Sequence, residues 1–352
     1  MLAALTRLQA LAVIVLIVLL AAASLTIGAS ESGEAISGDG RYSDVQLYTD
    51  VGNAVAGGEG YYHAAVRLQR AHGFPTSPFV TVRLPTLAWI EAMLGWRVAG
   101  LLLDALLLAA AAAWFAMLRP LVGAPTRMAA MLLVLVGGAM AASPGLMVSH
   151  ELWAGTLVAL AAALRVRGAW VAAVIAAAAA LAIRELALPF VLVAAFWSLV
   201  EGRRREFATW AALVALYALI LALHRQAVIP LSLPTDALSQ AWGGLRGPGA
   251  VLQDIADVTL LHLIPAPFCF LAVFLSLAGF LGAPAPVARF AVPWLGGVAL
   301  LLAVFARPVN FYWAILCVPM VTAGLAFLPG MARDLARAVT RRAALGNPPS
   351  PL

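Results

Sequence analysis

Runs of apolar residues long enough to cross a bilayer recur along most of this chain, and they constrain its fold more than any other feature. A helix needs about 20 apolar residues to span the hydrocarbon core. The sequence of 352 residues is 64% hydrophobic and 11% charged, with a mean hydropathy of +0.97. A soluble domain of this length needs far more charge to cover its surface. The sequence therefore predicts an all-α polytopic membrane protein.

We expect about ten transmembrane helices. They lie near residues 8–28, 96–118, 128–147, 151–164, 169–184, 187–200, 207–224, 259–281, 290–306 and 311–328. The first run could instead be a cleaved signal peptide with small residues at 21–24. Its length favours a retained helix, because the apolar core of a signal peptide usually has about 7–15 residues. The fourth to sixth runs are short for upright spans, so they could be tilted, partly buried or divided differently.

The arginines indicate the orientation of the chain. All the basic residues are arginine, and counting alternate loops from a cytoplasmic N-terminus places most of them on one side. These are Arg7, Arg119, Arg127, Arg165, Arg167, Arg203, Arg204, Arg205, Arg289, Arg333, Arg337, Arg341 and Arg342. Only Glu201, Glu206 and Asp334 oppose them on that side. Because short basic loops stay in the cytoplasm, we expect both termini there.

This orientation gives a single transmembrane domain over 1–330 and a basic cytoplasmic tail over 331–352. Two long loops, 29–95 and 225–258, fall on the extracytoplasmic side. The first contains helix-like pieces at 43–56 and 61–72, separated by glycines, and its mixed composition is typical of amphipathic helices on the membrane surface.

The most informative stretch is 41–62, RYSDVQLYTDVGNAVAGGEGYY. On a helix, Asp44, Tyr48 and Val51 share one face, whereas Asp50 points elsewhere. Asp44 could simply be a first-turn or capping acid, which the helix dipole favours. Alternatively, it faces a cavity just beyond the first span, where it can take a proton from a hydroxyl.

The pattern Asp44-x3-Tyr48, a helix of small residues and then Gly57-Gly58-x2-Tyr61 resembles the first outer loop of integral-membrane C-type glycosyltransferases. Arg83-Leu84-Pro85 resembles the start of their second span. The likeness is greatest to the polyprenyl-mannose-dependent branch. It implies a polyprenyl-phosphate sugar donor and makes Asp44 the catalytic acid of the loop. The chain departs from the group in having Asp44 and Asp50 in place of an acidic pair, and in lacking a large C-terminal soluble domain.

Other polar residues on the expected outer side are candidates for binding substrate. Glu151 follows His150 and could cap a helix, bind the acceptor, or hold a metal together with His150. Arg184 and Glu185 lie between two apolar runs. The pair therefore either lines an interior cavity, or is a structural ion pair or one that snorkels to the membrane interface. In a lipid-phosphate enzyme, the forked donors of Arg184 would hold the donor phosphate.

The remaining candidates lie in the outer loops. Arg307 and Asn310 stand in an otherwise weakly polar turn before the last span, and we expect Arg307 to contact a phosphate or sugar. The substrate-binding set is completed by residues of the first loop: Tyr48, Asp50 and Arg83. No cofactor motif is present, a divalent cation stays an open alternative, and we expect no nucleic acid partner.

The leading hypothesis is an inverting glycosyltransferase of the bacterial inner membrane that acts on its extracytoplasmic face. Asp44 would be the general base, the donor a polyprenyl-phosphate sugar such as mannose, and the acceptor a lipid or a glycan. The alternative is a lipid or sugar transporter or flippase that uses Arg184, Glu185 and Asp104 to line a path, although no internal symmetry is evident. A polysaccharide polymerase or ligase and an inactive scaffolding relative stay open as well.

Overall fold

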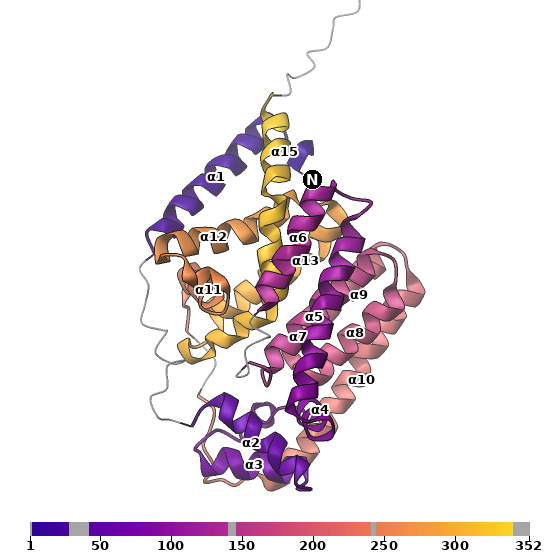
Figure 1. Ribbon diagram of the computed structural model, residues 1–352, viewed down its shortest axis with the longest axis vertical. Helices are drawn as coiled ribbons and strands as arrows, with labels where there is room; N and C mark the ends of the chain where they lie inside the picture. Colours follow the sequence, from indigo (N-terminus) through magenta and orange to yellow (C-terminus); the bar gives the residue numbers. More distant parts are fainter. Residues whose placement is uncertain (1, 28–41, 140–145, 241–243, 341–352) are drawn as a thin grey trace, which may run out of the picture.

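The computed structural model describes residues 2–27, 42–139, 146–240 and 244–340. In these ranges the protein is all-helical and forms no β-strand (Figure 1). The α-helices are α1 (Arg7–Leu25), α2 (Asp44–Ala56), α3 (Tyr61–Ala71), α4 (Thr86–Leu94), α5 (Trp96–Leu118), α6 (Ala124–Gly138), α7 (His150–Val166), α8 (Trp170–Ile183), α9 (Leu188–Val200), α10 (Arg204–Val228), α11 (Gly247–Asp257), α12 (Ala266–Gly279), α13 (Ala285–Val304), α14 (Val318–Val321) and α15 (Leu328–Thr340). The 3₁₀ segments used below are η5 (Glu185–Ala187), η9 (Pro308–Cys317) and η10 (Thr322–Phe327).

Within the described residues, five helical stretches are long and apolar enough to cross a membrane. They are Arg7–Leu25, Trp96–Leu118, Arg204–Leu231, Ala285–Val304 and Pro308–Thr340. Shorter apolar helices cover Ala124–Gly138, Trp170–Ile183, Glu185–Val200 and Ala266–Gly282. The membrane class expected from the sequence is therefore supported, while the number of ten spans and the sides of the loops stay predictions.

Helix α7 lies at the centre of the bundle, and most of its side chains are buried. It packs against α5, α8 and η9. Small residues permit this close packing, as is usual between membrane helices. A Cβ added at Gly155 would lie 2.6 Å from the backbone oxygen of Leu316. Because α7 is buried from its first turn, His150 and Glu151 at its N-terminus are held in the interior.

Helix α1 is peripheral and exposes most of its apolar side chains, as a lipid-facing span does. It contacts α12 and α15. The apolar face of α15 carries Met331, Leu335 and Ala338, which pack in one cluster with Leu2 and Ala10. Residues 331–340 of the expected tail thus belong to a docked helix, whereas 341–352 lie outside the described residues.

Helices α2, α3 and α4 gather at the end of the molecule opposite α15 (Figure 1). We call these three helices the outer cap, a name that refers to this end of the molecule and not to a side of the membrane. The helices expected at 43–56 and 61–72 are confirmed as α2 and α3. Ser43 caps α2 by accepting a hydrogen bond from the Gln46 amide, and the chain turns at Gly58 with a φ of +94°. Residues 29–41 of the expected first loop lie outside the described residues.

The segment that follows α10 is fastened to the outer cap. Asp236 accepts hydrogen bonds from Arg70 Nε at 2.5 Å and from Thr76 Oγ1 at 2.8 Å. The Ser239 amide donates to the Ser77 carbonyl at 2.8 Å. These contacts bring the beginning of the second expected loop, 225–258, against the first.

Candidate functional site

A cavity of about 320 Å³ lies where the outer cap meets η5 and η9. Its walls come from segments that are far apart in the sequence. Seven of the nine candidate residues line it: Asp44, Tyr48, Arg83, Arg184, Glu185, Arg307 and Asn310. The structure therefore brings most of the sequence-derived candidates to one place.

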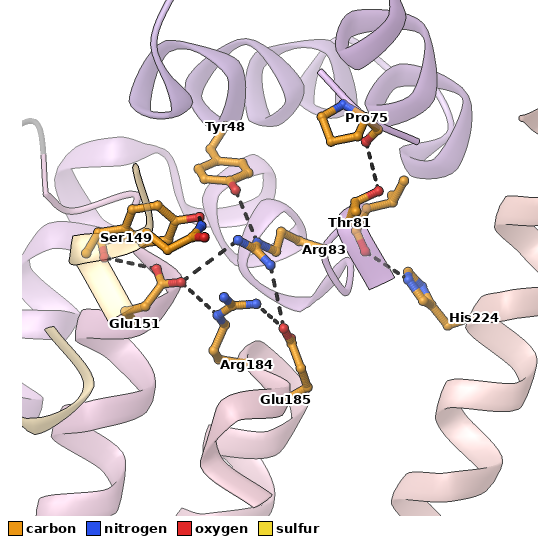
Figure 2. Close-up of polar contacts among 12 residues, drawn as sticks. Tyr48, Pro75, Thr81, Arg83, Ser149, Glu151, Arg184, Glu185 and His224 are labelled. Carbon is orange, nitrogen blue, oxygen red and sulfur yellow. Dashed lines mark hydrogen bonds and ion pairs between the residues drawn. The ribbon is translucent and has the colours of Figure 1, made fainter. Parts of the chain in front are cut away.

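Four of the charged side chains near the cavity form a group of alternating sign (Figure 2). Arg184 contacts Glu151 at 2.7 Å and also pairs with Glu185. Arg83 lies farther from the same two carboxylates, at 3.6 Å from Glu185 and 4.0 Å from Glu151. We call these four residues the charged quartet. Arg184 is the more tightly paired and more deeply buried of the two arginines, with 1% of its side chain exposed against 11% for Arg83.

Asp44 begins α2 and faces this group without joining it. Its carboxylate forms no hydrogen bond or ion pair with the described residues. Burial raises the pKa of Asp44 above its ordinary value of 3.8, and the nearby Arg83 opposes the rise. The capping role considered for Asp44 belongs to Ser43. Asp44 is thus a first-turn acid and also a carboxylate on the cavity wall.

Tyr48 lies one turn further along α2. Its phenolic oxygen accepts a hydrogen bond from Arg83 Nε at 3.1 Å, and its ring packs edge-on against His150 with centroids 4.8 Å apart. Burial raises the pKa of Tyr48 far above its ordinary value. The phenol therefore keeps its proton, which it can donate to a ligand.

Two of the candidate substrate-binding residues, Asp50 and Glu151, do not line the cavity. Asp50 does not line the cavity, because six residues along a helix carry it to another face. It accepts a hydrogen bond from the Tyr42 hydroxyl at 2.5 Å. Glu151 does not cap α7, since Ser149 does so. Glu151 is 3% exposed and lies behind the cavity wall, where it holds Arg184.

Arg307 also lines the cavity, at the start of η9. Its Nε donates to Asn310 Oδ1 at 3.1 Å, and its Nη1 donates to Gln240 Oε1 at 3.2 Å. Asn310 in turn donates from Nδ2 to the Tyr312 hydroxyl at 3.3 Å. Both acceptors of Arg307 are neutral amides, and the described residues supply it with no carboxylate. Among the described residues, the guanidinium of Arg307 is thus hydrogen-bonded but not neutralised, and it can bind an anionic ligand.

Sequence reasoning missed several cavity residues, which come from α2, α3, the segment between α3 and α4, η5, the segment after α10, and η9. They are Leu47, Gln69, Phe74, Pro75, Val80, Thr81, Leu186, Ser239, Val309, Tyr312 and Trp313. Gln69 could have been noticed, because it falls in line with Tyr61 and Ala65 at intervals of four on the buried face of α3. An amide on an apolar helix face indicates a specific polar partner. The others follow from packing between distant segments.

Asp104, which the transport alternative requires, does not line the cavity and forms no ion pair with the described residues. Among those residues there is also no group of three His, Cys, Asp or Glu side chains arranged to hold a metal ion. Comparison of the chain with protein-family models, curated proteins and solved structures found no match.

Proposed function

We propose that this protein is a membrane glycosyltransferase that moves a sugar, such as mannose, from a polyprenyl-phosphate donor to a lipid or glycan acceptor. One observation carries the proposal. Asp44, a carboxylate without a hydrogen-bond or ion-pair partner among the described residues, shares a cavity with Arg307, a guanidinium to which those residues supply no acidic partner. A base and an anion-binding cation in one cavity suit a displacement in which a hydroxyl loses its proton to the base and a phosphate leaves with its charge stabilised by the cation.

Asp44 takes the proton from an acceptor hydroxyl as that oxygen attacks the anomeric carbon. The new bond forms from oxygen to carbon, while the bond from the anomeric carbon to the phosphate oxygen breaks. The polyprenyl phosphate leaves with the bonding electrons. A single displacement of this kind inverts the anomeric configuration. No nucleotide-binding domain is needed, because the leaving group is already a lipid phosphate.

The geometry separates the roles of the arginines. Arg184 is occupied by Glu151 and Glu185, so we assign it to holding the charged quartet together. Arg83 is held loosely by the same carboxylates and can turn toward an incoming anion. With Arg307 it would neutralise the charge that grows on the leaving phosphate. Tyr48, which already accepts a hydrogen bond from Arg83, would add its hydroxyl as a donor.

The arginine distribution supports a position for the site on the extracytoplasmic face of the bacterial inner membrane, with both termini in the cytoplasm. The donor would reach the cavity from the surrounding lipid. In this arrangement the outer cap and η9 would contact the substrate, and the transmembrane helices would hold them in position.

The test is transfer by the purified protein in proteoliposomes that contain polyprenyl-phosphate mannose with a radiolabelled sugar. A mixture of bacterial envelope lipids and glycans would serve as the acceptor. We expect labelled mannose in a new covalent product of inverted configuration. The absence of any such product would refute the proposal. Movement of the labelled lipid across the bilayer without covalent change would establish the transporter alternative.

A further inference from the structure

Gln69 has an acceptor atom that the described residues leave unused. The side chain is 5% exposed and lines the cavity. Its Nε2 donates to the carbonyls of Pro75 at 3.2 Å and Thr81 at 3.1 Å. Its Oε1 is buried and has no hydrogen-bond partner among the described residues. A buried acceptor without a partner is unfavourable, so this oxygen, on a residue of the cavity wall, calls for a hydrogen-bond donor from a ligand.

The orientation of this amide is fixed by its surroundings. If its nitrogen and oxygen were exchanged, the oxygen would face the Pro75 and Thr81 carbonyls at these distances, and both hydrogen bonds would be lost. The two backbone carbonyls therefore direct Oε1 away from themselves. Gln69 thus presents a carbonyl oxygen, which can accept a hydrogen bond from a hydroxyl group but repels an anion.

The rest of the cavity lining is mixed in character. Phe74, Pro75 and Val80 contribute mainly apolar surface, which suits the C–H faces of a sugar ring. Arg83 and Arg307 contribute cationic groups to the same lining. The cavity therefore offers both cations for an anion and, at Gln69, an acceptor among apolar side chains for a neutral group that bears hydroxyls.

Helix α3 holds both Gln69 and the backbone of Arg83 in place. At its first residue, the Tyr61 hydroxyl donates to the Arg83 carbonyl at 2.6 Å, which fixes the backbone that carries the guanidinium. Two turns later, Gln69 holds the Thr81 carbonyl. Helix α3 thus fixes the position of Gln69 relative to the backbone that carries Arg83.

We infer that Gln69 Oε1 accepts a hydrogen bond from a hydroxyl of the transferred sugar, which makes Gln69 a specificity-determining residue of the site. This inference rests on the proposed function, because it assigns the sugar part of the donor to the Gln69 wall. It adds that the protein selects the sugar itself and not only the lipid phosphate.

The test measures equilibrium binding to the full-length protein in nanodiscs, with polyprenyl-phosphate mannose and bare polyprenyl phosphate as probes. Wild-type protein should prefer the mannosyl lipid. Gln69→Leu should reduce that preference about fivefold, the change expected for about 1 kcal/mol of hydrogen bonding, and leave the affinity for bare polyprenyl phosphate unchanged. Gln46→Leu, the same replacement at an exposed position of the outer cap, serves as the control and should keep the full preference.

Monodeoxy analogues of the mannosyl lipid make the test independent of how well the variant folds. In wild-type protein one analogue should bind about fivefold more weakly than the parent lipid, and in Gln69→Leu that analogue and the parent should bind alike. Equal binding of all analogues by wild-type protein, or an undiminished preference in a folded Gln69→Leu protein, would overturn the inference. A protein that transfers sugar yet is indifferent to Gln69 would retain the proposed function without this inference. A protein whose preference depends on Gln69 but that transfers no sugar would retain the sugar-binding role of Gln69 and refute the proposed function.

Discussion

Arg83 donates a hydrogen bond from its Nε to the phenolic oxygen of Tyr48 across 3.1 Å, and this contact joins α2 to the segment that precedes α4. The same guanidinium faces Glu185 and Glu151 from the bundle. Arg83 therefore links the outer cap to η5 and α7. Because its contacts with the two carboxylates are long, it can move toward a bound anion without breaking a tight ion pair.

The different surroundings of Arg307 and Arg184 predict opposite effects on replacement. Arg307→Gln should weaken binding of polyprenyl phosphate about 10- to 100-fold, the contribution of a charge-assisted hydrogen bond, and leave the melting temperature unchanged. Arg184→Gln should lower stability by about 3–5 kcal/mol, because it removes the close cationic partner of the buried Glu151 carboxylate. Binding and thermal unfolding in detergent would be measured for both variants. A destabilised Arg307→Gln with full affinity would contradict the assignment.

The burial of Glu91 predicts that the stability of the protein depends on pH. The side chain is 4% exposed, and Oε1 has no hydrogen-bond partner among the described residues. Burial raises the pKa of Glu91 from 4.5 to about 9. The folded state then holds the proton more tightly than the unfolded state, so stability is greatest at low pH and falls as pH rises toward 9. Glu91→Gln should melt at a higher temperature than wild type at pH 8, with the difference shrinking toward pH 4.5. A constant difference would argue against a buried, protonated Glu91.

The contact between α12 and η10 depends on glycine. A Cβ added at Gly324 would lie 1.7 Å from the Ser276 carbonyl oxygen, whereas one at Gly296 would meet nothing within 4 Å. Gly324→Ala should destabilise the protein by about 3 kcal/mol through overpacking. Gly296→Ala should stabilise α13 by about 0.5–1 kcal/mol. Thermal unfolding of both variants measures these effects, and equal melting temperatures for the two variants would contradict the close packing of α12 against η10.

The sequence could predict features that depend on local pattern. The glycines at 57–58 and the mixture of apolar and charged residues indicate α2 and α3. The charged pair between two apolar runs indicates an interior site. Contacts between distant segments could not be predicted in this way. Asp236 meets Arg70 across 166 positions, and nothing local indicates that pairing. Likewise, the sequence does not show that Gln69 Oε1 is left without a partner. This follows from the structure, in which the Gln69 N–H groups donate to the Pro75 and Thr81 carbonyls.

The raised pKa of Asp44 predicts the acid limb of the pH profile. A general base acts only when ionised, so kcat/KM should fall as pH decreases through that pKa, which burial holds above 3.8 while Arg83 opposes the rise. Replacement of Arg83 by Gln should therefore move the limb to higher pH. Asp50→Asn, which alters an acid outside the cavity, should leave the limb in place. A profile with no acid limb would exclude Asp44 as the base.

The most direct measurement of the central claim is the turnover of Asp44→Asn in the proteoliposome transfer assay, with Asp50→Asn on the same helix as the control. Asparagine preserves the size of the side chain but cannot take the proton. We expect kcat to fall at least about 100-fold in Asp44→Asn, with donor affinity within about twofold of wild type, and we expect Asp50→Asn to behave as wild type. Undiminished turnover by Asp44→Asn would contradict the account.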